Sequence, residues 1–414
     1  MAAAVRRRET CRLCGGGSLE IVLSLAPTPP ANAFVREDLL VEAQAVFPLD
    51  LHFCTHCHHI QLLDVVDPAV LFENYVYVSG TSPVFVAHLH GQAVAVAGRF
   101  GLAKGDLVVE VGSNDGTLLR AFKDQGLKVL GIDPARDIAA SASEAGIETW
   151  PRFFSLELAA EIVRDRGSAR AVIANNVFAH ADDLEGFVAS VRELLSPDGV
   201  FVFEVSYLLD VYEKTLFDTI YHEHLAYHTV APLKRFFAAH GLDLFDAERV
   251  MAHGGSLRGF VQRAGGPHAS QPGVAALIAA ERAAGLDRAE TYQAFARRID
   301  ALGEELRSLL QGLKAEGRSV AGFGAPAKAT TLMYHFGLGP DVLDFIVDDA
   351  PLKQGLFTPG LHVPVLAAAA INERRPDYLL LLAWNFAEPI IANSQAFRDA
   401  GGHFIVPLPE VKVL

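Results

Sequence analysis

A short segment in the second half of the chain gathers side chains that can move protons. Residues 217–228 read FDTIYHEHLAYH, in which Tyr221, His222, Glu223 and His224 are consecutive. Histidine titrates near neutrality and can act as a base toward an acidic C–H bond, such as one next to a ketone. A tyrosine hydroxyl can donate a hydrogen bond to the enolate oxygen that forms. The segment is therefore a candidate for proton abstraction from carbon, which methylation of a carbon atom requires.

Other interpretations of this segment remain open. Tyr221 and His224 would share one face only if the segment were helical. The H-x-H spacing of His222 and His224 would also suit a metal ion, and a solvated turn would need no chemistry at all. We favour proton transfer, because no other residues in the sequence complete such a metal site convincingly.

The cysteines form two C-x-x-C pairs, CRLC and CTHC, whose members are Cys11, Cys14, Cys54 and Cys57. Two such pairs supply the four thiolates that structural zinc takes in tetrahedral geometry. Four thiolates leave no open position, so we expect this zinc to fold the N-terminal segment and not to catalyse. Unrelated buried cysteines and a redox pair are the alternatives. The histidines that could replace a thiolate are His52, His56, His58 and His59.

Residues 107–133 have the pattern of a strand, a glycine-rich turn, a helix and a second strand. We expect strands at 107–111 and 129–132, the second ending in Asp133. A carboxylate at that place can accept hydrogen bonds from both hydroxyls of a ribose. The turn, GSNDG, has polar side chains where the dinucleotide fingerprint has glycines. A ligand without phosphates, such as S-adenosylmethionine, therefore fits better, with another nucleotide as the alternative.

The alternation of strands and helices continues. We expect a strand at 171–174, a helix at 184–195, a turn at 197–199 and a strand at 200–204. Asn175, Asn176 and His180 follow the carboxyl end of the first of these strands, the edge at which open α/β sheets bind ligands.

The last third of the chain predicts one long helix and a second α/β fold. The helix, between 287 and 315, has apolar residues at Phe295, Ile299, Leu302, Leu306, Leu309 and Leu313. We expect it to pack inside the protein, with a coiled coil to a partner as the alternative. Strands are expected at 319–323, 343–347 and 378–382. Lys328 lies at the start of the helix after the first of them, where it could hold a diphosphate or be a plain surface lysine.

Length and charge limit the classes of protein that fit. A chain of 414 residues should contain two or three domains. The formal net charge of −14 and the lack of a basic stripe argue against nucleic acid as a partner. No apolar run reaches the roughly 20 residues of a membrane span, and the N-terminus lacks the pattern of a secretory signal. We therefore expect a cytoplasmic protein with no membrane partner.

The order of the motifs resembles that of a known family. The C-x-x-C pairs are followed by ENYVYVSGTS, EVGSNDGTLL, NNVFAH, YHEH, HGGSLR and FGAPAKATTLMYH, then by VDDAPLKQGLFTPGLHVPV, LLLAWNF and GGHFIVPLPEV. This series is similar to that of the S-adenosylmethionine-dependent C-methyltransferases of deoxysugar biosynthesis. The resemblance covers nearly the whole chain. Members act on thymidine-diphosphate-linked 4-keto-6-deoxy sugars, often at C3.

The resemblance implies an α/β protein of three parts. They are a small N-terminal zinc-binding domain at 1–66, a class I methyltransferase Rossmann-like domain at 67–246, and a second, C-terminal Rossmann-like α/β domain for the nucleotide sugar at 247–414. The substrate should lie in the cleft between the last two. The implied cofactors are S-adenosylmethionine and structural zinc. We expect a monomer, and the sequence leaves an oligomer open.

The same resemblance assigns roles to single residues. It makes His224 the base, with Tyr221 and Glu223 assisting by enolate stabilisation and by orienting the base. The residues that would line the reaction centre are His180 and Tyr75. Those that would hold the cofactor are Glu110, Gly112, Asn114, Asp133 and Asn176, and those that would contact the substrate are Tyr77, Ser256, Arg258 and Lys328.

Departures from the family pattern concern the substrate and leave the base intact. His228 and Thr229 follow Tyr227, and Phe323 and Ala329 stand in a region where the family favours Y-G-A-x-x-K-G. Which sugar and which nucleotide are bound therefore stays open. The alternatives are methylation at another carbon or on another nucleotide sugar, an NAD-dependent nucleotide-sugar oxidoreductase, and a zinc-ribbon interaction protein with a decayed enzyme core.

Overall fold

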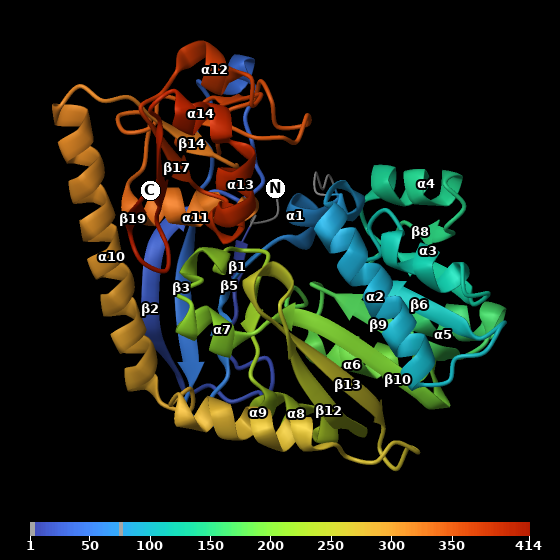
Figure 1. Cartoon of the computed structure of the whole chain (residues 1–414). Coiled ribbons are helices and arrows are strands. Elements are labelled where there is room, and N and C mark those ends of the chain that lie inside the picture. Colours follow the sequence, from blue (N-terminus) through green and yellow to red (C-terminus); the bar gives the residue numbers. More distant parts are fainter. Residues whose placement is uncertain (1–4, 74–77) are drawn as a thin grey trace.

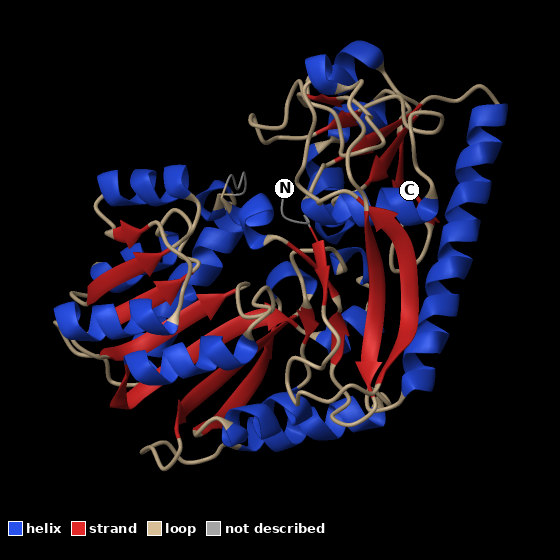
Figure 2. Ribbon diagram, turned by 180° about the vertical axis from the view of Figure 1, so that it is seen from behind, coloured by secondary structure: helices blue, strands red, loops and turns tan. Residues whose placement is uncertain are grey.

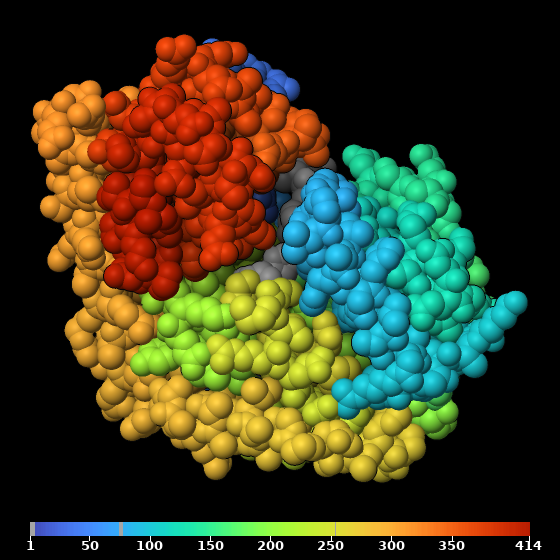
Figure 3. Space-filling view, viewed as in Figure 1, coloured from blue at the N-terminus to red at the C-terminus, as the bar shows by residue number. Residues whose placement is uncertain are grey.

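The computed structural model describes residues 5–73 and 78–414, which Figures 1 and 2 show from opposite sides. The strands of the described residues form four sheets. A small N-terminal part lies between a central α/β domain and a C-terminal α/β lobe (Figure 1). On the face shown in Figure 3, the surface is hollowed between the C-terminal lobe and the central domain.

The N-terminal part contains a four-stranded antiparallel sheet in the order β11-β4-β3-β2. Its strands are β2 (Leu19–Thr28), β3 (Phe47–Cys54), β4 (Ile60–Leu62) and β11 (Ala226–Tyr227), and a separate ladder pairs β1 (Val5–Arg7) with β5 (Asp64–Val66). Strand β11 follows the YHEH segment directly and pairs with β4. The backbone thus joins the candidate catalytic segment to the zinc-binding part.

A seven-stranded sheet forms the central domain. In spatial order its strands are β12 (Leu242–Val250), β13 (Ser256–Arg263), β10 (Leu195–Ser206), β9 (Ala169–Asn175), β6 (Leu107–Val111), β7 (Lys128–Ile132) and β8 (Thr149–Trp150). The strands from β8 to β10 are parallel, and β13 is antiparallel to both of its neighbours.

Helices cover both faces of this sheet, which explains why its inner parallel strands, such as β6 and β9, are mostly apolar. Because side chains alternate along a strand, Val108 packs with helices α2 (Pro83–Arg99) and α3 (Thr117–Lys123). Val109 faces the opposite side and belongs to the core that contains residues of α5 (Leu156–Arg166) and α6 (Leu184–Leu194). Figure 2 shows the helices on the two sides of the sheet.

One sequence expectation needs correction in this domain, and an expected domain boundary coincides with a strand. The turn expected at 197–199 lies within β10, where the pairing with β9 changes register between Leu195 and Val200. Pro197 has no N–H to donate to the ladder, which accounts for an irregularity inside the strand instead of a break in it. The boundary expected at 246/247 falls inside β12, and β13 completes the same sheet. We therefore propose that the central domain extends to Arg263.

The C-terminal lobe contains a six-stranded sheet. In spatial order its strands are β16 (Val365–Leu366), β15 (Ile346–Val347), β14 (Val320–Phe323), β17 (Tyr378–Leu381), β18 (His403–Val406) and β19 (Lys412–Val413). All neighbours are parallel except the last pair. Strand β15 is shorter than the expected 343–347, and the apolar residues Leu343 and Phe345 are buried in the connection before it.

The long helix is α10 (Ala289–Ala315), close to the expected range. Its buried residues are Tyr292, Phe295, Ile299, Gly303, Leu306, Leu310 and Leu313. All of them except Gly303 belong to the main hydrophobic core, and α10 runs along the outer side of strand β2 in both views (Figures 1 and 2). The helix therefore packs inside the protein, as expected.

The remaining helices are short. They are α1 (Pro68–Phe72), α4 (Arg136–Glu144), α7 (Leu208–Glu213), α8 (Val230–Ala239), α9 (Pro272–Ala283), α11 (Ala327–Phe336), α12 (Ala370–Arg374), α13 (Ala387–Asn393) and α14 (Gln395–Asp399). Short 3-10 helices are η1 (Glu37–Leu39), η2 (Ser79–Thr81), η3 (Phe217–Thr219), η4 (Ala252–Gly254) and η5 (Trp384–Phe386). In the described part of the chain, no helix has both the length and the apolar character needed to cross a membrane.

Candidate active site

The four cysteines lie together at the junction of the N-terminal part and the central domain. Their sulfur atoms are all within 4.8 Å of one another. Cys11 Sγ is 3.5 Å from Cys57 Sγ, and Cys14 Sγ is 3.6 Å from Cys54 Sγ. Tetrahedral zinc with Zn–S bonds of ~2.3 Å spaces its sulfurs by ~3.8 Å, so the cluster fits zinc. Among the described residues no histidine joins the group.

The glycine-rich turn after β6 is compressed against the segment after β9. Gly112 has a φ of +70°, and a Cβ there would lie 2.2 Å from Val177 Cγ2. Only glycine tolerates both the left-handed backbone and this contact. Asn176, just before Val177, donates its backbone N–H to the carbonyl of Glu204 (2.7 Å). The structure thus brings Gly112 and Asn176 together, as expected for residues that hold a cofactor.

Asp133 braces this turn. Its Oδ2 accepts the backbone N–H of Asn114 (2.8 Å), and its Oδ1 accepts that of Ala135 (2.9 Å). Each carboxylate oxygen has a second lone pair, so two ribose hydroxyls could still donate to it. The side chain is buried, and burial raises its pKa.

Carboxylates dominate the surroundings of the turn. Glu110 is buried, and its Oε2 has no hydrogen-bond partner among the described residues. Burial, together with the charges of Asp115 and Asp133, raises the pKa of Glu110 well above its ordinary value. A bound cation would offset this crowding of negative charge, whereas a pyrophosphate would increase it. The site therefore fits S-adenosylmethionine, which carries a sulfonium and an ammonium group, better than it fits a dinucleotide.

A short segment that the sequence analysis did not assign covers the turn. Ser79 donates its backbone N–H to Asn114 Oδ1, and Gly80 donates its own to Asp115 Oδ2, both at 2.9 Å. A Cβ at Gly80 would lie 2.4 Å from Asp115 Oδ2, so a larger residue here would displace the carboxylate that this backbone binds. The motif SGTS was the available signal. The predicted residues Tyr75 and Tyr77 lie outside the described residues.

Four aromatic rings form a continuous series near the glycine-rich turn after β6, which we call the cofactor turn. Phe72 stacks on His180 with centroids 5.5 Å apart, His180 stacks on His224 at 5.1 Å, and the rings of His224 and Tyr221 are 4.2 Å apart. His180 donates its backbone N–H to the carbonyl of Val177, the residue that closes over the turn. The imidazole of the YHEH segment is thus linked to the glycine-rich turn through His180 and Val177.

The hydrogen bonds of the YHEH segment fix the state of His224. The segment is a turn and not a helix, closed by the backbone N–H of His224, which donates to Tyr221 O (2.9 Å). His224 Nδ1 lies 2.7 Å from the carbonyl oxygen of Thr219, which can only accept. In the neutral ring Nδ1 therefore carries the proton, and Nε2 is the basic nitrogen. The sequence analysis missed Thr219, because a backbone carbonyl has no sequence signature.

The two residues between Tyr221 and His224 differ in their surroundings. His222 is buried against Phe47, donates Nε2–H to its carbonyl oxygen (3.2 Å), and has a pKa lowered to about 4 by burial. His222 therefore has a structural role, since its ring packs against Phe47 and binds the backbone carbonyl of that residue. Glu223 Oε1 accepts from Asn32 Nδ2 (2.9 Å), so the loop between β2 and β3 reaches the catalytic segment. Asn32 was missed as well.

Lys328 lies where the C-terminal lobe meets the YHEH segment. Its Nζ is 3.6 Å from Asp218 Oδ2 and 4.3 Å from the centre of the Trp384 ring, and burial lowers its pKa. Trp384 Nε1 donates to the same carboxylate (2.6 Å). Thr331, on the same helix α11, donates its hydroxyl to the carbonyl of Ile220 (2.8 Å). Lys328 is thus a partly buried lysine and not a plain surface one.

Ser256 and Arg258 have contacts within the central sheet. Arg258 Nη2 pairs with Glu204 Oε2 and Arg258 Nη1 with Glu248 Oε1, both at 2.8 Å, across three adjacent strands. Ser256 is buried and donates to the carbonyl of Ala252 (3.1 Å). These contacts hold β10, β12 and β13 together, and the substrate role predicted for the two residues stays a prediction.

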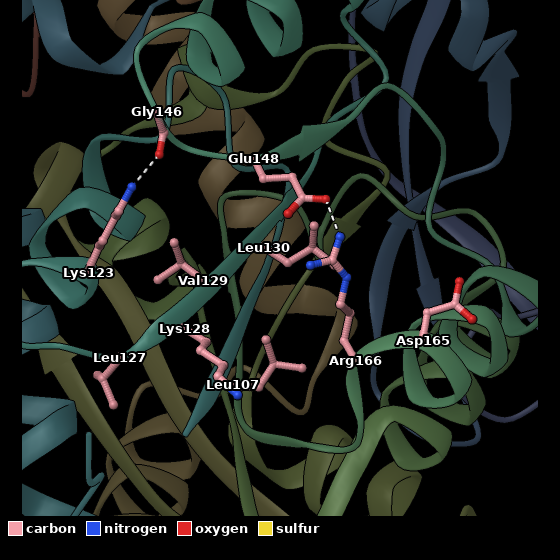
Figure 4. Close-up of a pocket in the computed structure, with 10 residues that line it drawn as sticks. All are labelled: Leu107, Lys123, Leu127, Lys128, Val129, Leu130, Gly146, Glu148, Asp165 and Arg166. Atoms are coloured by element: carbon pink, nitrogen blue, oxygen red, sulfur yellow. Dashed lines mark hydrogen bonds and ion pairs between the residues drawn. The ribbon is translucent and has the colours of Figure 1, made fainter. Parts of the chain in front are cut away.

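One cavity lies away from this site. Figure 4 shows the lining residues of a cavity of about 610 Å³, which are Leu107, Lys123, Leu127, Lys128, Val129, Leu130, Gly146, Glu148, Asp165 and Arg166. Leu107 and Lys128 begin strands β6 and β7, whereas the cofactor turn and Asp133 follow the ends of these strands. The cavity is therefore at the opposite edge of the sheet.

The strand order, the carboxylate-lined turn and the cysteine cluster define a methyltransferase with a zinc-binding N-terminal part. Three family models match consecutive segments of the chain: a zinc binding domain at residues 11–72, a methyltransferase domain at 87–246 and a C-methyltransferase C-terminal domain at 251–409. The last match begins before β13, the strand that completes the central sheet.

The chain also matches a curated relative over its whole length. The C-methyltransferase NovU of Streptomyces niveus is 39% identical over 414 residues, which are 100% of this chain and 99% of that protein. The chain therefore belongs to this family of C-methyltransferases. It is an S-adenosylmethionine-dependent enzyme that also binds zinc. The alternatives of an oxidoreductase and of an interaction protein without catalysis are thereby set aside.

Two similar solved structures each align with less than half of the chain. The magnesium protoporphyrin IX methyltransferase of Synechocystis PCC 6803 with bound SAM is 14% identical, with a TM-score of 0.32, over 43% of this chain and 81% of that one. A SAM-dependent methyltransferase of Anabaena variabilis is 16% identical, with a TM-score of 0.35, over 43% and 86%.

Proposed function

We propose that the enzyme methylates the carbon next to the ketone of a nucleotide-diphosphate-linked 4-keto-6-deoxy sugar. By the resemblance of its motifs, the nucleotide is thymidine diphosphate and the carbon is C3. The observation that carries the proposal is the position of His224, whose Nδ1 is fixed on a carbonyl and whose ring lies in the aromatic series beside the cofactor turn. An imidazole held in this tautomer suits proton abstraction from carbon.

The catalytic residues divide the proton transfer between them. Nε2 of His224 takes the proton from the carbon next to the ketone, and Nδ1–H stays bonded to Thr219. The hydroxyl of Tyr221 donates a hydrogen bond to the enolate oxygen. Glu223, held by Asn32, fixes the turn that carries both residues. His180 is stacked on the base, and burial next to His224 keeps its pKa well below the ordinary value, so it lines the centre as a neutral ring.

The cofactor site orients the methyl donor. S-adenosylmethionine, when bound, supplies the methyl group through its sulfonium. Asp133 holds the ribose, and Glu110 balances the positive charge. Gly112, Asn114 and Asn176 form the walls of the site. The segment at Ser79 and Gly80 covers the turn and keeps water from it. Such positioning is the main contribution that a protein makes to a displacement at carbon.

The C-terminal lobe holds the nucleotide end of the substrate. Lys328 lies at the start of α11 and next to the YHEH segment, so one end of a bound substrate can reach the base while its diphosphate meets the lysine. We place the substrate between the central domain and this lobe. We also propose that the enzyme acts as a monomer in the cytoplasm, where four reduced cysteines remain available for zinc.

The test is incubation with methyl-labelled S-adenosylmethionine and a panel of nucleotide keto sugars, followed by mass spectrometry and NMR of the products. We expect one added methyl group on carbon next to the ketone. Incubation in deuterated water without the methyl donor gives a second readout, because the base alone should exchange that proton. Methylation on oxygen, or no exchange with any keto sugar, would contradict the proposal.

A further inference from the structure

Three arginines of the N-terminal part converge on one carboxylate of the central domain, Asp182. Arg6 contacts Asp182 Oδ2, and Arg12 Nη2 lies 2.9 Å from Oδ1. Arg8 Nη1 lies 3.4 Å from Oδ1 and donates to the backbone carbonyl of Asp182 at 3.1 Å. Asp182 is two residues after His180. We call this group of four residues the Asp182 clamp.

The fully buried arginine of the clamp belongs to the zinc site. Arg12 stands between the ligands Cys11 and Cys14, and its side chain is fully buried. Its backbone N–H and its Nη1 both donate to Gln61 Oε1 (3.1 and 3.0 Å), and Nη1 also donates to the carbonyl of Leu62. The guanidinium is thus oriented by β4 as well as by the turn from Cys11 to Cys14, which we call the zinc knuckle. A charge pair with so little solvent depends strongly on geometry.

The loop that carries His180 is held from several directions. The ring of His180 lies between Phe72 and His224. The carbonyl of Ala179 accepts the backbone N–H groups of Leu225 and Ala226 (2.9 and 3.1 Å). The latter bonds tie the loop to the YHEH segment. Phe72 and the three arginines of the clamp all come from the first 72 residues of the chain. That part therefore supplies contacts on one side of the candidate reaction centre.

We propose that the zinc knuckle is a positioning device for His180, which acts through Arg12 and Asp182. Zinc fixes the turn from Cys11 to Cys14 and thereby Arg12. Arg12 holds Asp182, and Asp182 sets the path of the loop that presents His180 to the base. Arg12 and Asp182 are positioning residues, because neither touches the reacting atoms. The inference rests on the proposed role of His180 at the reaction centre.

The first test is Asp182→Asn in the full-length, zinc-loaded enzyme. We expect kcat to fall about tenfold to a hundredfold, the scale of a ~1 Å misplacement of a catalytic group. KM for S-adenosylmethionine and the zinc content should stay within twofold of the wild type. Hydrogen exchange of residues 177–184, followed by mass spectrometry, should become faster. Asp182→Glu, which keeps the charge, should recover part of kcat.

The matched control is Arg7→Met. Arg7 stands in the same arginine run, and its Nη1 pairs with Asp64 Oδ2 at 2.7 Å. This variant removes an ion pair of the N-terminal part without touching Asp182. We expect its kcat and the hydrogen exchange of residues 177–184 to match those of the wild type.

The second test removes zinc. Chelation in the wild type should raise hydrogen exchange of residues 177–184, as Asp182→Asn does. In Arg12→Met the exchange should be raised already, and chelation should add little, because the link from metal to loop is cut. Equal and additive increases in the two proteins would overturn the proposed connection.

The outcomes separate this inference from the proposed function. Unchanged exchange of residues 177–184 in Asp182→Asn overturns the clamp, and raised exchange with an unchanged kcat overturns its positioning role. A wild type that methylates no keto sugar contradicts the proposed function, and hydrogen exchange then decides the clamp alone. A parallel loss of zinc and of cofactor binding in Asp182→Asn would show a general structural role and would also overturn the inference.

Discussion

The central domain and the C-terminal lobe share one framework. In each sheet the first strand, β6 or β14, has the second strand on one side and the fourth on the other, and a third strand flanks the second. In each, an aspartate after the second strand braces the turn after the first. Asp348 Oδ2 accepts the backbone N–H of Ala325 (2.6 Å) and its Oδ1 that of Ala350 (2.8 Å), which repeats the contacts of Asp133.

The side chains around the two turns differ in charge. The first turn is surrounded by Glu110 and Asp115, which together with Asp133 form a negative environment. The second lies beside Lys328 and beside Lys353, whose Nζ donates to the carbonyl of Ala325 (2.8 Å). The comparison teaches that the framework builds a turn and a helix start, whereas the flanking side chains decide the charge of the ligand. A cationic cofactor suits the first turn, and an anionic diphosphate suits the second.

The largest effect should come from His224, the proposed base. We expect His224→Asn to lower methyl transfer about a thousandfold, which lies within the range for a lost general base. Both turns should still bind their ligands, so the affinities for S-adenosylmethionine and for the nucleotide sugar should change less than threefold. Isothermal titration measures both. A variant with full activity would eliminate His224 as the base.

A crossed pair of variants tests whether the two aspartates serve different ligands. Asp133→Asn should weaken cofactor binding about tenfold to a hundredfold, because the amide NH₂ would face a backbone N–H and leave it unpaired. Nucleotide-sugar binding should hardly change. Asp348→Asn should show the reverse pattern. If both variants weaken the same ligand, the assignment of one ligand to each lobe is wrong.

A smaller effect is expected from Lys353, one of the two lysines beside the second turn. Lys353→Met should raise KM for the nucleotide sugar about tenfold, leave kcat nearly unchanged and reduce the salt dependence of kcat/KM. Lys314→Met is the control, since Lys314 pairs with Asp344 in the same lobe (2.9 Å) and lies away from the turn. Equal effects of the two variants would argue against a diphosphate at this turn.

The smallest effect concerns the pH dependence of the stability of the folded protein. His228, stacked between Phe178 and His59 near the central domain, is buried, and burial lowers its pKa to about 3. In the unfolded chain His228 binds a proton near pH 6.5, whereas in the folded protein it stays neutral down to about pH 3. The free energy of unfolding therefore falls as the pH drops from ~6.5 toward 3, by about 1.4 kcal/mol per pH unit. His228→Phe should remove this contribution. Urea unfolding at pH 7.5 and pH 5 measures it, and an unchanged pH dependence would count against a neutral, buried His228.

The sequence was sufficient to predict the features that depend on residues close together along the chain. The strand at Leu107–Val111, the turn after it and the long helix α10 follow from periodicity and glycine placement, which act over a few residues. The zinc ligands could be predicted because C-x-x-C spacing is itself local. The division of the chain into domains was less accessible, because β13 enters the central sheet from beyond the expected boundary.

The tertiary structure decided what depends on residues far apart. The carbonyl of Thr219 sets the tautomer of His224, Asn32 holds Glu223, and the arginines of the N-terminus meet Asp182. No spacing in the sequence encodes such contacts, since each depends on how two separate segments pack. The sequence alone thus determined which chemical groups the protein possesses and the local elements that carry them. Packing decided which groups face one another, because the distance between two side chains is set by the fold and not by their separation along the chain.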